Sequence, residues 1–316
     1  MCTAVTYKTK DHYFGRNLDL ERTYGERVVI TPRNYIFKMR SVPSLENHYA
    51  LIGMATVIDG YPLYYEATNE KGLSMAGLNF PDNAEYKELE AGKDNVAPFE
   101  FIPWILGQCA NMQEVRNALN KLNLAQINFS ENLPLTPLHW MISDREQSIT
   151  VECIKDGLKI YENPFGVLTN NPTFDYHMMN LNNYMGLHEG FAVNNLCNDI
   201  TLKNYSLGLG ALGLPGDFSS VSRFVKAVYV KQKSHSGDSE KESVSQFFHI
   251  LSSVAMPKGC ILAANGEYEY TRYSSCCNTD KGIYYYTTYD CSTVTSIDMQ
   301  SVDLNNNKIY QYDLIE

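Results

Sequence analysis

Short turns join successive strand-like segments of this chain, and that connectivity constrains the fold more than any other feature. β-Branched residues alternate with others over residues 2–8, the turn TKDH follows, and YFGRN returns over residues 13–17. The segments YPLYYEAT (61–68) and LSMAGLNF (73–80) are joined in the same way by NEKG. Each pair predicts a hairpin, and tight turns of this kind join antiparallel strands. We therefore expect antiparallel sheets.

Two later parts of the chain repeat this pattern. The segments HWMISD, SITVECI, LKIYEN and GVLTNN predict a meander between residues 139 and 171, with Asn170 at its end. GIYYYTTYD, TVTSIDM and KIYQYDL predict three strands between residues 282 and 314. Helical spacing of apolar residues interrupts the strands over residues 98–109, 112–124, 219–232 and 243–255. Runs of strands followed by pairs of helices predict an α+β layered fold, with sheets covered by helices, and not a doubly wound parallel sheet.

The charge and the length of the chain limit its class. The 316 residues include 26 Lys and Arg against 36 Asp and Glu, a net charge of -10, which argues against nucleic acid as a partner. No run of apolar residues is long enough to predict a membrane span. Charged residues interrupt the N-terminal segment early, so the cytoplasm is the expected compartment. No linker or repeat is apparent, and a single domain over residues 1–316 is expected.

The sequence predicts neither a metal site nor a cofactor. The eight cysteines form no C-x-x-C pair, and none of the seven histidines has the spacing of metal ligands. Without a signal segment, the cysteines are expected to be reduced thiols. GLGALG (208–213) matches a dinucleotide-binding pattern, but Pro215 and Gly216 follow where that pattern requires a helix. A flexible loop is the expected structure there.

Cys2 directly follows the initiator methionine, and this position has a chemical meaning. Methionine aminopeptidases remove Met1 when the next residue is small, which would leave Cys2 with a free α-amine. The reference pKa is about 8.5 for a thiol and about 7.7–8.0 for an α-amine. One residue would then supply both a nucleophile and its base. A first hairpin centred near residues 8–10 places Cys2 opposite about Asn17, with Arg16 diagonally beside it.

Two charged residues of the returning strand are expected within reach of Cys2. Arg16 would favour the thiolate, and Asp19 would hold the α-ammonium or accept its hydrogen bond. The alternative interpretation is that Arg16 and Asp19 form a surface ion pair and that Cys2 has no role. A Cys–His pair with a distant histidine stays open, although nothing in the sequence supports it.

Several motifs, in order, resemble those of the choloylglycine hydrolase family: MCTA, FGRNLD, NEKGLSMAGLNFP, LHWMISD, GVLTNNPTFDY and GLPGDFSSVSRFVKA. That family contains bile salt hydrolases and penicillin V acylases, which are N-terminal nucleophile hydrolases. The resemblance extends from Cys2 to the GIYYYTTYD segment and so covers nearly the whole chain. It implies an αββα sandwich, two antiparallel sheets covered by helices, and it favours the catalytic interpretation of Cys2.

The motifs imply six catalytic positions, namely Cys2, Arg16, Asp19, Asn79, Asn170 and Arg223. The first resembles the nucleophile, and the next two resemble the pair that orients it. Asn79 and Asn170 resemble oxyanion-hole and amine-binding residues, and Arg223 resembles the buried charge that completes the site. From the residues alone, the two asparagines would be turn residues, and Arg223 would be an exposed helix residue.

Asn79 also bears on the substrate, because bile salt hydrolases usually carry Asn where penicillin V acylases more often carry Tyr. The resemblance implies hydrolysis of glycine- or taurine-conjugated bile salts through a thioester on Cys2. Penicillin V, another N-acyl amide, and a non-catalytic bile-acid-binding role stay open as alternatives. The loops of the family imply an apolar cleft lined by Leu18, Ile58, Tyr65, Phe129 and Leu133, although any of these could be ordinary core residues.

The segment from His188 to Ser206 has little core pattern. Members of the family are commonly homotetramers, held partly by an excursion in this region, so a homotetramer is implied here. The loop LGLGALG (207–213) is expected to border the entrance of the site.

Overall fold

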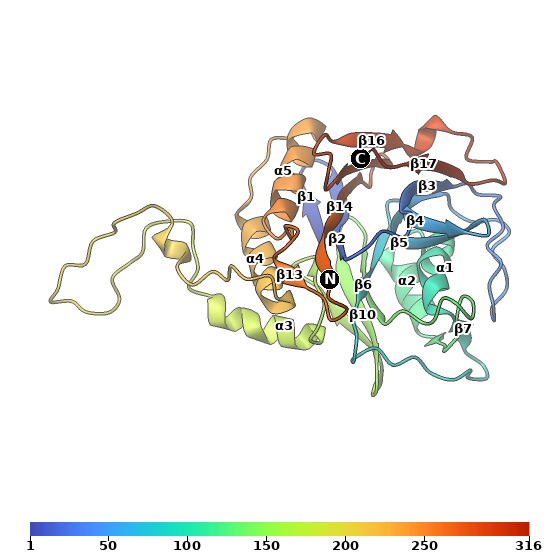
Figure 1. Cartoon of the computed structure of the whole chain (residues 1–316), viewed down its shortest axis with the longest axis horizontal. Coiled ribbons are helices and arrows are strands. Elements are labelled where there is room, and N and C mark those ends of the chain that lie inside the picture. Colours follow the sequence, from blue (N-terminus) through green and yellow to red (C-terminus); the bar gives the residue numbers. More distant parts are fainter. Residues whose placement is uncertain (316) are drawn as a thin grey trace.

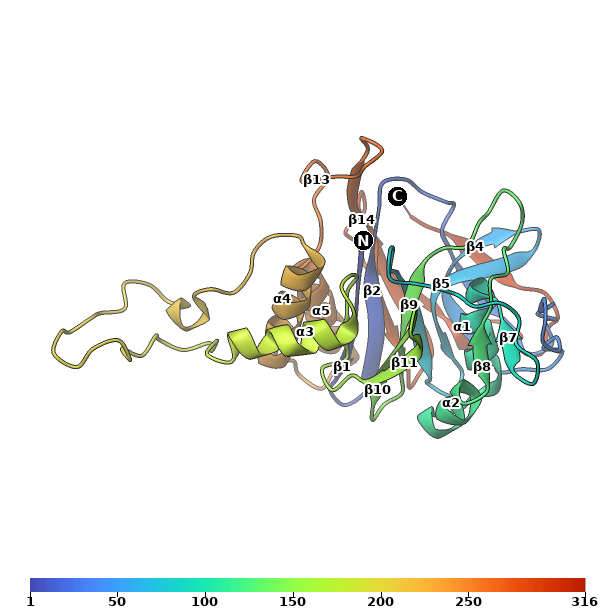
Figure 2. The same cartoon turned by 90° about the horizontal axis from the view of Figure 1, so that it is seen from below.

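Two antiparallel sheets lie face to face in this chain, and helices cover both outer faces (Figure 1). The structure is a computed structural model, and it describes residues 1–315. In Figure 2 the layers follow one another from α3, α4 and α5 through the two sheets to α1 and α2. This is the α+β arrangement that the hairpins and helix pairs predict, and it is the αββα sandwich that the resemblance to the family implies.

The elements of the two sheets and of the helical layers have the following bounds. The first sheet contains β12 (Val167–Leu168), β1 (Cys2–Lys8), β2 (His12–Leu20), β14 (Tyr268–Asn278), β15 (Ile283–Thr288) and β16 (Thr295–Asp298) in this order, and β13 (Ile261–Leu262) pairs with β14. The second contains β11 (Gly157–Glu162), β10 (Ser148–Ile154), β9 (Leu138–Ser143), β6 (Ser74–Asn79), β5 (Tyr61–Asn69), β4 (Leu51–Ile58), β3 (Arg27–Thr31) and β17 (Tyr310–Asp313). The helices are α1 (Phe101–Gln108), α2 (Met112–Leu119), α3 (Phe174–Asn180), α4 (Ser220–Lys233) and α5 (Glu240–Ser252), and β7 (Asp94–Val96) pairs with β8 (Leu122–Leu124).

The register of the first hairpin differs by one residue from the prediction. Lys8 pairs with His12, so the turn is centred on Lys10, and Cys2 lies opposite Leu18 and not Asn17. Arg16 lies opposite Ala4. Since side chains alternate along a strand, Cys2, Leu18 and Arg16 share one face of the sheet.

Two predicted groups of strands are divided between the sheets. β9, β10 and β11 form the expected meander, but β12 leaves it and pairs with β1 in the first sheet. Likewise, β15 and β16 belong to the first sheet, whereas β17 pairs with β3 at an edge of the second. Because β12 pairs with β1, Asn170, which follows β12 by two residues, lies beside the strand that carries Cys2.

β14 is a long strand that no sequence pattern above predicts. Its sequence, YEYTRYSSCCN, mixes small, polar and aromatic residues without apolar alternation. The strand nevertheless lies between β2 and β15, and seven of its eleven residues are buried. Both of its faces are covered, so the alternation of a half-exposed strand is missing.

The helices lie close to where their spacing places them. α1 packs on β5 and β6, while α4 and α5 cover the opposite layer against β1, β2 and β14. Asn111 caps α2 and Ser219 caps α4 through side-chain oxygens that accept main-chain N–H bonds. The helix predicted over residues 112–124 is too long, because α2 ends at Leu119 and the chain continues into β8. The cap at Ser219 places Arg223 on the inner side of α4.

A long excursion between α3 and α4 leaves the body of the molecule. We call residues 185–212 the arm; they extend far beyond the sandwich in both views (Figure 1, Figure 2). The arm exposes large apolar side chains, with Leu196 and Tyr205 more than four-fifths accessible at 86% and 85%. None of the helices formed by residues 1–315 combines the length and the apolar character that crossing a membrane requires.

Candidate active site

Cys2 begins β1 and lies at an end of the first sheet. It is 3% exposed and faces Leu18 across the ladder. Met1 extends this ladder by one residue. Its carbonyl oxygen accepts a hydrogen bond from the Asp19 amide at 3.0 Å, and its amine donates to the Asp19 carbonyl at 2.8 Å. With Met1 attached, the nitrogen of Cys2 is a buried amide.

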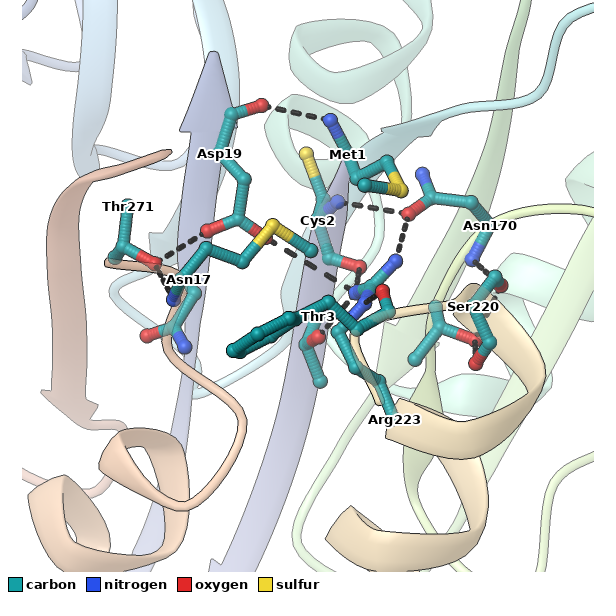
Figure 3. A network of polar contacts seen from close by, with 12 residues as sticks. Met1, Cys2, Thr3, Asn17, Asp19, Asn170, Ser220, Arg223 and Thr271 are labelled. Atoms are coloured by element: carbon teal, nitrogen blue, oxygen red, sulfur yellow. Dashed lines mark hydrogen bonds and ion pairs between the residues drawn. The ribbon is translucent and has the colours of Figure 1, made fainter. Parts of the chain in front are cut away.

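The side chain of Asn170 connects three of the other predicted site residues, and Figure 3 shows its bonds to two of them, Cys2 and Arg223. Its Oδ1 accepts hydrogen bonds from the main-chain nitrogen of Cys2 and from Nη2 of Arg223, both at 2.8 Å. Its Nδ2 donates to the carbonyl oxygen of Asn79 at 2.7 Å. The single amide therefore links the nucleophile strand, α4 and the end of β6.

Buried side chains fix the main chain around Asn170. Oγ of Ser220 accepts the hydrogen bond of the Asn170 amide at 2.8 Å, and Nε2 of His177 donates to its carbonyl oxygen at 2.9 Å. Nε2 of His139 donates to the preceding carbonyl, that of Thr169, at 3.0 Å. Burial lowers the pKa of His177 to about 4, so its ring is neutral near pH 7.

Arg223 reaches the site from α4 and is 1% exposed. Its Nη1 donates to the carbonyl oxygen of Cys2 at 2.6 Å and to Oγ1 of Thr3 at 2.7 Å. The same nitrogen lies 4.0 Å from Oδ2 of Asp19. Burial lowers the pKa of Arg223, and the neighbouring Asp19 and Cys2 oppose that change. Arg223 is buried against the main chain of Cys2, so its interpretation as an exposed helix residue is wrong, while its role in catalysis stays a prediction.

Asp19 lies on the other face of the first sheet from the Cys2 side chain, towards α4 and α5. Thr271 donates a hydrogen bond to its Oδ1 at 2.6 Å. Oδ2 is buried and has no hydrogen-bond partner among residues 1–315. A buried carboxylate oxygen in this state calls for a cationic or N–H partner, and Arg223 at 4.0 Å is the cation near it.

Arg16 is fully buried and lies on the face of Cys2, between the two sheets. Its Nη1 donates to the carbonyl oxygens of Gly77 at 2.6 Å and Tyr65 at 3.1 Å. Its Nε lies 3.8 Å from Oε2 of Glu66. Burial by itself lowers the pKa of Arg16, but the surrounding acidic groups, with Cys2 the foremost, raise it above its ordinary value. A cation is therefore held permanently on the side of the thiol.

The structure rejects a surface ion pair between Arg16 and Asp19. Both residues are 0% exposed, and as residues an odd number of positions apart on β2 they point to opposite faces of the sheet. Among residues 1–315, no hydrogen bond joins the Cys2 thiol to a histidine, so the Cys–His alternative gains no support.

Asn79 ends β6, as the sequence predicts, and is half-buried. Its carbonyl oxygen receives the hydrogen bond from Asn170. Its side-chain amide forms no hydrogen bond within the described part of the chain, and so it retains donors for a ligand.

The predicted substrate-lining residues lie in three places. Leu18 is buried directly opposite Cys2. Ile58 and Tyr65 belong to the hairpin formed by β4 and β5, and both are half-buried. Phe129 and Leu133, also half-buried, lie in the loop before β9. The loop before β9 contacts the β4–β5 hairpin, because Phe129 packs against Tyr61 of β5 with ring centroids 5.8 Å apart.

Four polar residues around the site are absent from the sequence predictions. They are Ser220 and His177, which hold Asn170, Thr271, which holds Asp19, and Glu66, which faces Arg16. Ser220 follows a recognisable helix cap, so its position near a helix start could be inferred. Nothing in the sequence alone signals the other three.

The arrangement suits nucleophilic attack by the first residue of a strand. A thiol lies beside a permanent cation, and the nitrogen of the same residue lies against the acceptor Oδ1 of Asn170. Burial lowers the pKa of the Met1 amine, one residue away, with Cys2 and Asp19 opposing the change. An α-amine at this end of the sheet is therefore in an environment that favours its neutral, basic form.

Comparison with known proteins gives matches over the whole chain. Residues 2–312 match the family model of linear amide C–N hydrolases, choloylglycine hydrolase family. A bile salt hydrolase/transferase from Lactiplantibacillus plantarum is 53% identical over 99% of this chain and 97% of its own length. Among solved structures, a mutant conjugated bile acid hydrolase from Clostridium perfringens has a TM-score of 0.92 and 39% identity, covering 100% of this chain and 97% of that one. A penicillin V acylase from Agrobacterium tumefaciens has a TM-score of 0.76 at 20% identity, covering 99% and 91%.

Proposed function

The chain belongs to the choloylglycine hydrolase family of linear amide C–N hydrolases, and on that premise we propose that its substrates are conjugated bile salts. It hydrolyses the amide bond between the steroid side chain and glycine or taurine, releasing the free bile acid and the amino acid. The observation that carries this proposal is the 53% identity over nearly the full length to a bile salt hydrolase/transferase. The site described above supplies the chemistry.

The reaction requires that Met1 be removed, so that Cys2 carries the α-amine. The amine accepts the proton of the thiol, and the thiolate attacks the amide carbonyl of the substrate. When the tetrahedral intermediate collapses, the C–N bond breaks, the α-amine protonates the leaving nitrogen, and a thioester remains on Cys2. Water, deprotonated by the same amine, then attacks the thioester and releases the bile acid.

The surrounding residues have separate roles in this proposal. Asn170 and Asp19 hold the α-amine, the first through the oxygen that already accepts the Cys2 N–H at 2.8 Å and the second through its unpartnered Oδ2. Arg16 favours the thiolate from the face of the first sheet that also carries the thiol. Asn79 and Asn170 supply N–H donors to the oxyanion, where one donor is worth about 2.7–4 kcal/mol of transition-state stabilisation. Arg223 fixes the Cys2 carbonyl, so that the nucleophile keeps its place.

The steroid is proposed to lie on apolar side chains near Cys2. Leu18, Ile58, Tyr65, Phe129 and Leu133 would line this surface. It is supported by the position of Leu18 opposite the nucleophile and by the contact between the loop of Phe129 and the β4–β5 hairpin. Large apolar and aromatic surfaces are what a steroid requires.

A comparison of substrates tests the assignment. We expect kcat/KM for taurocholate and glycocholate to exceed that for penicillin V, because Asn79 occupies the position at which acylases more often carry Tyr. A clear preference for penicillin V would overturn the proposal. The likeness to the penicillin V acylase does not predict such a preference, because at 20% identity it supports the fold alone. Binding of bile acids without any turnover by the wild type would instead point to a non-catalytic homologue. Cys2→Ala, which should abolish turnover, is the control.

We also propose that the protein is a cytoplasmic homotetramer with one catalytic domain in each chain. The arm, exposed and apolar, is the element proposed to hold the copies together. A pocket of about 390 Å³ between β11 and α3, lined by Tyr161, Phe174, Met178 and Met179 among others, offers an apolar surface for the arm of another copy. The eight cysteines are free thiols, as a reducing compartment would leave them.

A further inference from the structure

Glu66 is a carboxylate buried between the two sheets that the mechanism above does not use. It belongs to β5 of the second sheet and is 2% exposed. Three hydroxyl groups of the first sheet donate to it: Tyr273 to Oε2 at 2.7 Å, and Tyr284 and Ser275 to Oε1 at 2.5 and 3.0 Å. Burial raises the pKa of Glu66, while Arg16 and these hydroxyls oppose the rise. Such a set of donors suits a carboxylate anion.

Two separate links join Glu66 to Arg16. The first is the ion pair, with Nε of Arg16 3.8 Å from Oε2 of Glu66 and both side chains at most 2% exposed. The second passes through Ser275, whose hydroxyl accepts the hydrogen bond of the Arg16 amide at 3.2 Å and donates to Glu66. Glu66 therefore contacts the guanidinium directly and the main chain of the same residue through one hydroxyl.

The guanidinium has little freedom to move once these contacts are made. Nη1 donates to the carbonyls of Tyr65 and Gly77 on the second sheet. Nε donates to the carbonyl of Asn17 at 3.5 Å and lies 3.8 Å from the Glu66 carboxylate. Nη2 is buried and has no hydrogen-bond partner among residues 1–315. A guanidinium with one idle donor group is oriented by the partners of the other nitrogens, of which Glu66 is the charged one.

We propose that Glu66 is a positioning residue of the active site, whose carboxylate fixes the Arg16 guanidinium beside Cys2 and tempers the effect of that cation on the thiol. The inference rests on the proposed function, in which Cys2 is the nucleophile and Arg16 favours its thiolate. Taking a carboxylate out of water is expensive, and buried ion pairs contribute little net stability. A role in orienting Arg16 gives this charge a function.

The proposal predicts two effects of removing the Glu66 carboxylate: the Cys2 thiolate forms more easily, yet turnover becomes slower. Without the carboxylate, the cation near Cys2 is no longer partly neutralised, so the thiolate forms more easily and the thiol titrates at lower pH. Without its anchor, the guanidinium leaves the productive orientation, so kcat falls. The groups that face Glu66 are Arg16 on β2, Tyr273 and Cys277 on β14, and Tyr284 on β15.

The groups that face Cys2 must also be considered in reading its titration. They are the α-amine of Cys2 itself in the processed protein, Arg16, which lies on its own face of the sheet, and Asp19 and Arg223, which lie on the side of α4. Substitution of Glu66 leaves all four groups in place in the sequence. A change in the titration of Cys2 would therefore report the loss of the Glu66 charge or a movement of Arg16.

The variant Glu66→Gln keeps the size of the side chain and an oxygen acceptor but removes the charge. In the processed protein, the rate at which iodoacetamide alkylates Cys2, followed by mass spectrometry of the N-terminal peptide, should reach its midpoint about half to one pH unit lower than in the wild type. The kcat for glycocholate should fall about tenfold or more, with KM changed less than about twofold. Glu100→Gln, which removes a carboxylate at the start of α1 that is also buried but accepts from the amides of Arg40 and Ala97 and not from Arg16, should change neither quantity.

A second variant separates charge from position. Glu66→Asp retains the negative charge but shortens the side chain by one methylene, so the carboxylate lies farther from Arg16. The alkylation midpoint should therefore stay at the wild-type pH, while kcat should be partly lost. An alkylation midpoint in Glu66→Gln that does not fall below that of the wild type, or an unchanged kcat, would overturn the proposal. If Glu66→Gln does not fold, a shifted midpoint or an unchanged kcat in Glu66→Asp would overturn it. Alkylation requires no substrate, so a failure of the substrate assignment would leave this readout intact and distinguishable.

Discussion

The main-chain nitrogen of Cys2 donates a hydrogen bond to Oδ1 of Asn170 at 2.8 Å, across 168 positions of sequence. The same oxygen accepts a hydrogen bond from Arg223, so the acceptor is held before a substrate arrives. In the proposed mechanism that nitrogen becomes the base. One amide oxygen thus determines where the base lies relative to its thiol.

Removal of Met1 should accompany activity. We expect the intact mass of the active protein to be lower than the full sequence by one methionine residue, because only then is the nitrogen of Cys2 an amine. The variant Cys2→Ala should also lose Met1, since Ala is small, yet show no turnover. A protein that retains Met1 and turns over bile salts at full rate would contradict the mechanism.

Substitution of Asn170 should affect catalysis more than folding. Asn170→Ala removes the acceptor of the Cys2 nitrogen and a proposed oxyanion donor, so we expect kcat/KM for glycocholate to fall about 100-fold to 1,000-fold. Asn171→Ala is the matched control, because the Asn171 amide donates to the carbonyl of Pro81 and not to the Cys2 strand. Equal losses in the two variants would show that the loop, and not the Asn170 side chain, is responsible.

Arg223 should stabilise the fold as well as the site. Arg223→Leu leaves the buried Oδ2 of Asp19 without its nearby cation and removes two hydrogen bonds to β1. Breaking a buried charge pair in this way lowers the free energy of unfolding by about 3–5 kcal/mol. Urea denaturation of this variant and of Lys226→Ala, on the same helix, measures the difference. A loss below about 1 kcal/mol would mean that the pair contributes as little as an exposed one.

Two buried histidines should make the protein sensitive to acid. Burial lowers the pKa of His12 and of His177 from 6.5 to about 4. Between these values the unfolded chain binds protons that the native state does not, so stability is complete above pH 6.5 and is lost as the pH falls towards 4. Each of the two histidines should lower the free energy of unfolding at acid pH by roughly 3 kcal/mol.

Urea denaturation between pH 7.5 and 4.5 tests this dependence. His177→Gln keeps an N–H donor for the Asn170 carbonyl but cannot titrate, so its stability should vary less with pH than that of the wild type. An identical slope in both proteins would assign the acid sensitivity to other groups.

Most of the arm can be deleted without stretching the main chain that remains. Gly210 donates to the carbonyl of Gly190 at 3.1 Å, so residues 191–209 can be deleted and the two glycines joined. We expect the deletion variant to have the mass of a smaller species by light scattering, while the wild type has that of a tetramer. Lys233→Ala, which breaks the ion pair with Glu189 at the base of the arm, should remain tetrameric. A tetrameric deletion variant would exclude the arm as the contact.

The sequence predicts local structure well because local patterns determine it. The hairpin of β5 and β6 and the ends of α4 follow from turns and caps that lie within a few residues of each other. The resemblance of two motifs also implied that Asn79 and Asn170 belong to the site, although both would otherwise be assigned to turns. The structure joins them by a hydrogen bond, and their catalytic roles stay predictions.

Non-local pairing explains what the sequence does not reveal. β12 has only two residues, Val167 and Leu168, and no local signal distinguishes a final strand of the meander from one that crosses to β1. β14 lacks alternation because both of its faces are covered. Glu66 shows the same limit for the site, since its four partners come from three strands of the opposite sheet.

The hydrogen bonds between Met1 and Asp19 imply that Met1 must be removed before the first sheet has formed. In the finished fold, the amine and the carbonyl of Met1 are both engaged by the neighbouring strand, so an aminopeptidase finds no extended free end. Asn170 is synthesised long after Cys2, and at 5–20 residues per second the ribosome takes roughly ten seconds or more to reach it. Within the proposed scheme, maturation belongs to that interval. Cleavage thus competes with the closing of the sheet, and a chain that folds first keeps its methionine and never becomes an enzyme.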